Sequence, residues 1–127
     1  MGTKPLRALV VDDSQTSLTL LVRLLESLGV EVLSADSGRL AVEMALAQPV
    51  PFDVIFLDIC MPEYSGNQVA QELREKAYTG SIIAFTASTS SQGQAHSKKS
   101  GIDKYLGKQS ISKELLSALL DAYCNRS

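Results

Sequence analysis

The chain has 127 residues, of which 45% are hydrophobic and 20% are charged. These proportions are those of a globular domain with one core, and they exclude a chain that is disordered throughout. Twelve basic and fourteen acidic residues give a net charge of −2, which argues against a nucleic-acid-binding domain. No apolar run approaches the roughly 18 residues that span a bilayer, and the polar N-terminus lacks the pattern of a signal peptide. We therefore expect a single domain over residues 1–127, with its core between about 6 and 123, and no nucleic-acid or membrane partner.

Two cysteines, Cys60 and Cys124, lie far apart in the sequence. Their spacing matches no metal-binding motif, and a domain with a good core needs no disulfide. The cysteine content favours a reducing compartment, so we expect the protein to be cytoplasmic.

The first half of the chain alternates between apolar runs and helical stripes. Residues 8–11 are a continuous apolar run that ends at Asp12, which predicts a buried strand. Leucines at helical spacing follow, between a cap at Ser14 and a stop at Gly29. Residues 30–35 predict a weaker strand. The next helical stripe is short, and its apolar positions are Leu40, Ala41, Met44 and Ala47.

The second half continues this alternation. Residues 54–57 are a second strongly apolar run, and Ser65 with Gln68 fits the capping box that opens a helix. Gly80 is expected to close that helix, and residues 82–85 predict a third buried strand.

The last elements are weaker. Residues 88–100 are rich in Ser, Gln and Lys, so we expect only a short, weakly held helix near 94–99. A short strand is expected to end near Lys108. A leucine stripe capped by Ser110 or Ser112 predicts the final helix.

Five strands alternating with five helices predict an α/β domain with a parallel sheet that helices cover on both faces. Continuous apolar runs, instead of alternating apolar and polar residues, are typical of such doubly covered strands. Right-handed crossovers leave few topologies for a sheet of this kind.

Polar residues follow four of the predicted strands where each strand ends: Asp12 and Asp13, Asp58, Thr86, and Lys108. The carboxyl ends of parallel strands meet at one edge of the sheet, so these side chains should share one crevice. Three carboxylates placed together repel one another unless a cation neutralises them, and oxygen ligands suit Mg²⁺. A lysine and a hydroxyl beside them could bind an anion. The set predicts a site for phosphoryl transfer to a carboxylate.

Four motifs carry a family resemblance: Val10–Ser14, Leu57–Pro62 with Gly66 after it, Thr86-Ala87, and Gly101–Lys108. In this order and spacing, from about Leu6 to Tyr123, the chain resembles the receiver domain of two-component response regulators. The resemblance implies a single doubly wound, flavodoxin-like domain of five strand–helix pairs, with strand order 2-1-3-4-5.

The resemblance also implies roles for the site. Asp58 would accept a phosphoryl group from a phosphohistidine on a histidine kinase or a histidine phosphotransfer protein. Mg²⁺, or Mn²⁺ in its place, would be held by Asp58, by Asp13 directly, by Asp12 mostly through water, and by the backbone carbonyl of Cys60. Lys108 would contact the phosphoryl oxygens.

The same resemblance implies a switch. Thr86 would move toward the phosphoryl group and Tyr105 would swing inward behind it. This movement would change the surface formed by the fourth helix, the fifth strand and the final helix, where a downstream protein would bind. Such a domain is a signalling module that catalyses only its own phosphorylation and dephosphorylation, and it can form homodimers.

One position departs from the family. The lysine is usually followed by proline, often with a cis peptide bond, whereas Gln109 follows Lys108 here. A cis bond before a residue other than proline costs about 2.5–4 kcal/mol. We therefore expect a trans bond, with Lys108 still reaching Asp58.

Two other functions fit part of the pattern. A Mg²⁺-dependent hydrolase of phosphate esters also uses an aspartyl-phosphate, but it usually has a second aspartate two residues after the nucleophile, where this chain has Cys60. A flavodoxin-like cofactor carrier would need a phosphate loop rich in Ser, Thr and Gly where Asp12 and Asp13 stand. The residues after Lys108 suffice for one helix, so we expect no output domain in these 127 residues. The sequence leaves open whether the domain stands alone or comes from a hybrid kinase or a longer regulator.

Overall fold

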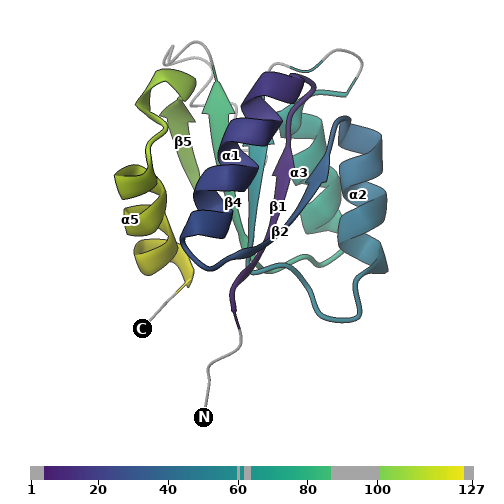
Figure 1. Cartoon of the computed structure of the whole chain (residues 1–127). Coiled ribbons are helices and arrows are strands. Elements are labelled where there is room, and N and C mark those ends of the chain that lie inside the picture. The colour runs from purple at the N-terminus through teal and green to yellow at the C-terminus, as the bar shows by residue number, and fades with distance from the viewer. Residues whose placement is uncertain (1–4, 60, 62–63, 87–100, 125–127) are drawn as a thin grey trace.

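The computed structural model of the protein describes residues 5–59, 61, 64–86 and 101–124. Its centre is a sheet of five parallel strands in the order β2-β1-β3-β4-β5, with helices on both faces (Figure 1). The strands are β1 (Arg7–Val11), β2 (Glu31–Ala35), β3 (Val54–Asp58), β4 (Ser81–Thr86) and β5 (Lys104–Gly107). The helices are α1 (Gln15–Ser27), α2 (Gly38–Ala47), α3 (Gly66–Glu75) and α5 (Lys113–Cys124), with a short 3-10 helix, η1 (Lys108–Ser110), after β5. The expected fold and strand order are confirmed, and the helix expected near 94–99 lies outside the described residues.

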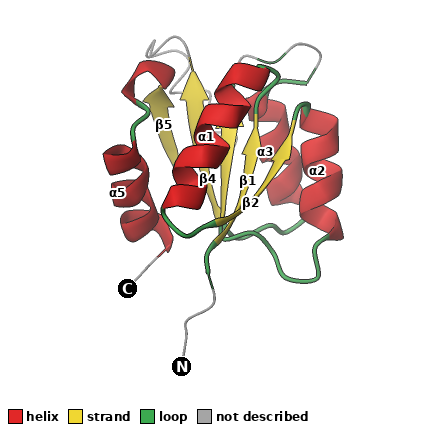
Figure 2. Ribbon diagram, in the orientation of Figure 1, coloured by secondary structure: helices red, strands yellow, loops and turns green. Residues whose placement is uncertain are grey.

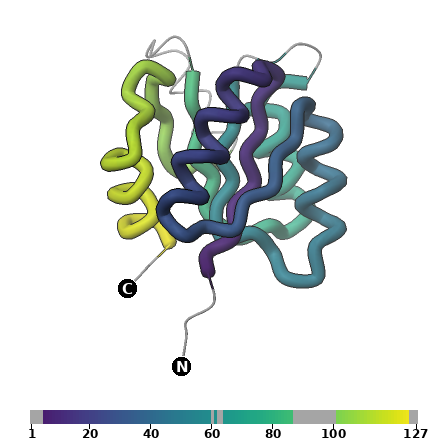
Figure 3. The backbone as a smooth tube through the Cα atoms, viewed as in Figure 1, coloured from purple at the N-terminus to yellow at the C-terminus, as the bar shows by residue number. Residues whose placement is uncertain are grey.

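The central strands explain the continuous apolar runs of the sequence. All five residues of β3 and the last four of β1 are buried. The backbone trace shows β1 running between β2 and β3 (Figure 3). Since helices cover both faces of the sheet, these strands need apolar side chains on both faces. β2 lies at one edge of the sheet, and three of its five residues are exposed.

The sheet divides the core into two hydrophobic clusters. On one face the leucines of α1 and α5 pack over Phe56 and Phe85, and this is the α1/α5 cluster. On the other face α2 and α3 pack over Leu9, Ile55 and Ile82, and this is the α2/α3 cluster. The two helix pairs lie on opposite sides of the strands in Figure 1.

Helix α1 begins and ends as the sequence predicts. The Ser17 amide donates to the Ser14 hydroxyl at 3.4 Å, so Ser14 caps the helix. Gly29 has a φ of 82°, the left-handed conformation that glycine adopts most readily, and it turns the chain into β2. Helix α5 starts in the same manner, with Ser112 accepting from the Leu115 amide at 3.1 Å.

The expected apolar stripe of α2 is wrong in detail. Its buried residues are Gly38, Ala41, Val42 and Ala45. Leu40, which the stripe placed in the core, is 39% exposed. The start of α2 lies so close to the next crossover that a Cβ on Gly38 would be 2.4 Å from the Tyr64 ring. Close packing of this kind favours small residues toward the core, and it leaves the larger Leu40 outside.

Helix α3 starts where expected and ends earlier. The capping box of Ser65 and Gln68 is formed, with both of its hydrogen bonds present. The helix ends at Glu75, whereas the sequence placed its end at Gly80. Ala77 adopts a φ of 69°, so the chain leaves the helix through a residue that does not signal a stop. Within the part of the chain that the structure describes, no helix combines the length and apolar character needed to cross a membrane.

Candidate functional site at the carboxyl edge of the sheet

The predicted site residues stand at the carboxyl edge of the sheet. Asp12 directly follows β1, Asp58 ends β3, Thr86 ends β4 and Lys108 follows β5. All strand arrows in Figure 2 point toward this edge. The parallel sheet therefore brings together residues that lie far apart in the sequence.

Three carboxylates form the centre of the site. One oxygen each of Asp12, Asp13 and Asp58 lies within 4.8 Å of the others. Asp12 is 1% exposed and Asp58 is 4% exposed, whereas Asp13 is exposed to solvent. Like charges at this distance repel, and burial of two of them reduces the screening by water. The arrangement stabilises a cation placed among the three groups.

Lys108 supplies one such cation. Its Nζ lies 2.9 Å from Asp12 Oδ2 and 3.3 Å from Asp58 Oδ2, so the ammonium bridges the two buried carboxylates. Burial by itself would lower the pKa of Lys108, but the hydrogen bond to Asp12 and the charge of Asp58 outweigh it and raise the pKa. Lys108 therefore remains protonated at neutral pH.

Asp12 has both carboxylate oxygens engaged. Its Oδ1 accepts the Ser14 amide at 2.8 Å, and its Oδ2 pairs with Lys108. Ser14 therefore has two tasks, since its side chain caps α1 and its backbone N–H holds Asp12. Only the first task could be predicted, because a backbone contact leaves no signal in the sequence. Asp13 is the exposed carboxylate of the three and has the freest access to a hydrated ion.

Gly66 fixes the backbone around Asp58. A Cβ at this position would lie 2.6 Å from the Asp58 carbonyl oxygen, so the start of α3 presses directly on the end of β3. The Gly66 amide donates to the Ile59 carbonyl at 3.2 Å. The sequence named Gly66 only as part of the family motif, and the capping box of Ser65 and Gln68 predicted the start of the helix that makes this contact.

Thr86 and Tyr105 lie on neighbouring strands. Thr86 is 1% exposed and follows Phe85, which pairs with Asp58. Tyr105 pairs with Ala84 and is half-buried, with its side chain against the α2/α3 cluster. The structure thus places Thr86 at the site edge, while the movement expected of both residues stays a prediction. Cys60, expected to supply a carbonyl ligand, lies outside the described residues.

The loop after β5 keeps Lys108 in reach without proline. The Lys108–Gln109 peptide bond is trans, as expected. The loop turns through η1, where the Ser110 hydroxyl donates to the Gly107 carbonyl at 2.7 Å. The Gln109 carboxamide folds back over Gly107, and a Cβ there would lie 2.6 Å from it. The expected contact between Lys108 and Asp58 is therefore confirmed despite the departure at Gln109.

Three comparisons with known proteins agree with this geometry. The family model described as the response regulator receiver domain matches residues 8–120. PilH of Pseudomonas aeruginosa is 35% identical over 115 residues, which cover 89% of this chain and 93% of PilH. The sensor histidine kinase GacS of Pseudomonas protegens is 32% identical over 125 residues, and these cover 94% of this chain and 13% of that kinase.

A solved structure shows the same fold. The receiver domain of the sensor histidine kinase PA1611 of Pseudomonas aeruginosa superimposes with a TM-score of 0.86 at 26% identity. The alignment covers 97% of this chain and all of that domain. In that structure a magnesium ion is coordinated in the active site cleft. The similar proteins therefore include both a short protein of nearly the same extent and a receiver within a much longer kinase.

Proposed function

This chain belongs to the response regulator receiver family of two-component signalling, and from that premise we propose that it accepts a phosphoryl group on Asp58. One observation carries the proposal: the ammonium of Lys108 bridges Asp58 and Asp12 within a group of three carboxylates. Family membership favours this function over the phosphate-ester hydrolase and the cofactor carrier. We propose that residues 1–127 form one receiver domain, with its core between about 6 and 123.

The transfer makes one bond and breaks one bond. An Asp58 carboxylate oxygen attacks the phosphorus of a phosphohistidine, and the P–N bond to the imidazole breaks, so the partner's histidine leaves with the electron pair. Lys108 already lies beside Asp58, so its ammonium can turn to the phosphoryl oxygens as their charge arrives. The Thr86 hydroxyl, at the end of the neighbouring strand, would donate a hydrogen bond to the same oxygens.

Mg²⁺ fits the donor set of the site, since three carboxylates with oxygens within 4.8 Å suit a hard cation that retains several waters. We assign Asp13 and Asp58 as direct ligands, and Asp12 as a ligand through water, because both of its oxygens already have partners. The backbone carbonyl of Cys60 is the further ligand that we propose from the family. When bound, the ion would neutralise the negative charge that gathers between Asp58 and the phosphoryl group.

We propose a histidine kinase or a histidine phosphotransfer protein as the phosphodonor. The downstream partner would recognise the surface of the fourth helix, β5 and α5, where Tyr105 is half-buried. A homodimer formed through this surface is an alternative output. The cysteine content supports a cytoplasmic location.

Incubation with acetyl phosphate and Mg²⁺ tests the acceptor. Intact mass spectrometry should show one phosphoryl group, labile to base and to hydroxylamine as expected of an acyl phosphate, on the wild-type chain and none on the Asp58→Asn variant. Asp36→Asn is the matched control, because Asp36 is an exposed aspartate that follows β2 at the same edge. Labelling of Asp58→Asn at full stoichiometry would refute the assignment.

Titration calorimetry with MgCl₂ tests the metal ligands. Asp13→Ala should weaken Mg²⁺ binding more than Asp12→Ala, because Asp12 is held by Ser14 and Lys108. Equal binding by both variants and the wild type would contradict the proposed ligand set.

A further inference from the structure

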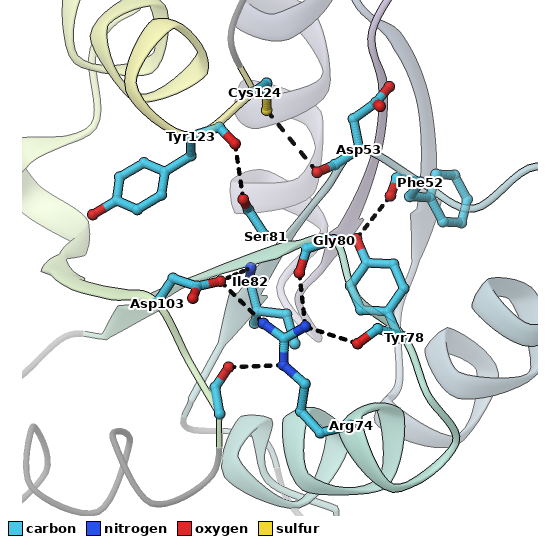
Figure 4. A network of polar contacts seen from close by, with 11 residues as sticks. Phe52, Asp53, Arg74, Tyr78, Gly80, Ser81, Ile82, Asp103, Tyr123 and Cys124 are labelled. Atoms are coloured by element: carbon cyan, nitrogen blue, oxygen red, sulfur yellow. Dashed lines mark hydrogen bonds and ion pairs between the residues drawn. The ribbon is translucent and has the colours of Figure 1, made fainter.

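A single arginine connects three parts of the chain at the amino edge of the sheet, opposite the carboxylates. Arg74 lies in the last turn of α3, and its guanidinium is at the centre of the network in Figure 4. Its bonds reach the carbonyls of Tyr78 and Gly80, each at 2.8 Å, the Gly101 carbonyl at 3.0 Å, and Asp103 Oδ2 at 3.0 Å. The guanidinium carbon also lies 5.6 Å from the centre of the Tyr78 ring. Arg74 thus joins the end of α3, the start of β4 and the residues before β5.

The partners of Arg74 fix the start of β5. Asp103 Oδ2 also accepts the Ile82 amide at 2.8 Å, and the Asp103 amide donates to the Ile82 carbonyl at 2.8 Å. Gly101 has a φ of 88°, and a Cβ there would lie 2.6 Å from Arg74 Cγ. Glycine at 101 therefore allows both the turn and the close approach of the arginine.

β5 needs this anchor more than the other strands do. It is an edge strand of four residues, and it pairs with β4 alone, from Lys104 opposite Ile83 to Gly107 opposite Thr86. Lys108 comes directly after β5, so along an extended strand it lies roughly 13 Å from Lys104, where the anchored strand begins. A shift at the start of so short a strand moves Lys108 relative to Asp12 and Asp58, which sit on other strands.

We propose that Arg74 is a positioning residue for Lys108, acting through the register and placement of β5. The inference rests on the proposed function of Lys108, although Arg74 itself lies at the far edge of the sheet from the phosphoryl site. Its guanidinium holds the start of the strand, and the strand presents the ammonium to the two buried carboxylates.

The test uses Arg74→Lys, which keeps the charge but loses the planar fork that reaches four acceptors. Arg39→Lys is the matched control, since Arg39 is an exposed arginine on α2. Phosphorylation of Arg74→Lys by acetyl phosphate should slow by roughly tenfold, as expected for a small displacement of a catalytic group. The control should react at the wild-type rate.

Mg²⁺ binding separates positioning from general destabilisation. Lys108 competes with the ion for Asp12 and Asp58, so a displaced ammonium should let Mg²⁺ bind about fivefold more tightly to Arg74→Lys. A variant that had merely lost structure would bind the ion more weakly, and this result would overturn the proposal.

A double-mutant cycle tests whether Arg74 acts through Lys108. Arg74→Lys should add nothing to the phosphorylation defect of Lys108→Ala. A further tenfold loss in the double variant would also overturn the proposal. If Arg74→Lys does not fold, Asp103→Asn replaces it, because the amide oxygen can still accept from Ile82 while the charge pair with Arg74 is lost.

Amide hydrogen exchange tests the role of Arg74 without depending on phosphorylation. The amides of β5 should exchange faster in Arg74→Lys than in the wild type, while those of β1 stay unchanged. If the wild-type chain accepted no phosphoryl group, the proposed function would fail, and the exchange and Mg²⁺ measurements would still decide the role of Arg74. Unchanged exchange in β5 would count against that role.

Discussion

The two edges of the sheet differ in how their charged side chains are balanced by partners. At the carboxyl edge, three carboxylates share one lysine, and two of those carboxylates are buried. At the amino edge, two arginines are surrounded by acceptors. Arg7 pairs with Glu31 at 2.7 Å and donates to the Gln48 side chain and the Val50 carbonyl, each also at 2.7 Å. Arg74 has an equally complete set of partners.

This difference indicates that the amino edge contributes to the stability of the domain, whereas the carboxyl edge carries the proposed phosphoryl-transfer site. Satisfied charges at the amino edge hold the starts of the strands together. The excess negative charge at the carboxyl edge opposes folding, and the proposed phosphoryl transfer is the reason that we give for its presence. Removal of the Arg74 charge and removal of the Asp58 charge should therefore change the free energy of unfolding in opposite directions.

The largest expected effect is at Arg74. Arg74→Ala removes the donors for three carbonyls and leaves Asp103 without its ion pair, so the free energy of unfolding should fall by about 2–3 kcal/mol. Urea unfolding followed by circular dichroism measures the change. Arg39→Ala, on the exposed face of α2, should stay within about 0.5 kcal/mol of the wild type. Equal effects of the two substitutions would show that the amino-edge network contributes nothing.

A substitution at Gly66 tests how closely the start of α3 packs against the end of β3. A methyl group at this position meets the Asp58 carbonyl at 2.6 Å, so Gly66→Ala should destabilise the fold by about 1–3 kcal/mol through overpacking. Gln71→Ala, at an exposed position of the same helix, is the control and should have little effect. A neutral or stabilising Gly66→Ala, as expected from helix propensity alone, would show that α3 can move away from β3.

Removal of a carboxylate should have the opposite sign. Asp58→Asn relieves part of the repulsion with Asp12 and Asp13, while Lys108 keeps its contact with Asp12. Without Mg²⁺ the variant should be more stable than the wild type by about 1 kcal/mol. The gain should shrink as Mg²⁺ is added, because the ion stabilises the wild type more. A destabilised Asp58→Asn would mean that the pair with Lys108 outweighs the repulsion.

The smallest effect concerns pH at the amino edge. Burial raises the pKa of Tyr78 well above its usual value, although the charge of Arg74 opposes the shift, and the hydroxyl donates to the Phe52 carbonyl at 2.9 Å. The folded state binds this proton more tightly than the unfolded state does. The stability due to Tyr78 is therefore complete below a pH of about 10 and is lost as the pH rises above it.

Absorbance at 295 nm during an alkaline titration measures this behaviour. One of the four tyrosines should ionise only as the protein unfolds. The resistant signal should disappear in Tyr78→Phe. Ionisation of all four tyrosines in the folded protein would contradict the buried hydrogen bond.

The sequence predicted the carboxyl edge better than the amino edge, and the reason is physical. Asp12 and Asp58 each follow an apolar run and Lys108 lies at the end of a predicted short strand, so a parallel sheet had to bring them together. Most of the contacts of Arg74 go to backbone carbonyls, and every residue type has a carbonyl. Arg74 was therefore indistinguishable in the sequence from a solvated arginine on a helix.

The errors in the helices have a similar origin. Ala77 takes a left-handed conformation that the sequence would assign to glycine, so the end of α3 was placed at Gly80. Leu40 was assigned to the core by its helical spacing from Met44 and Ala47, and the close approach of Gly38 to Tyr64 favours smaller residues on the inward face instead. In both cases tertiary contacts overruled a local preference.

The division of the core by the sheet has an evolutionary consequence. The α1/α5 cluster and the α2/α3 cluster lie on opposite faces, and the strands separate them. Substitutions in separate clusters should affect stability almost additively. The helices over one face can therefore change to suit a new partner while the other face retains its packing and the carboxylates keep their places at the ends of the strands.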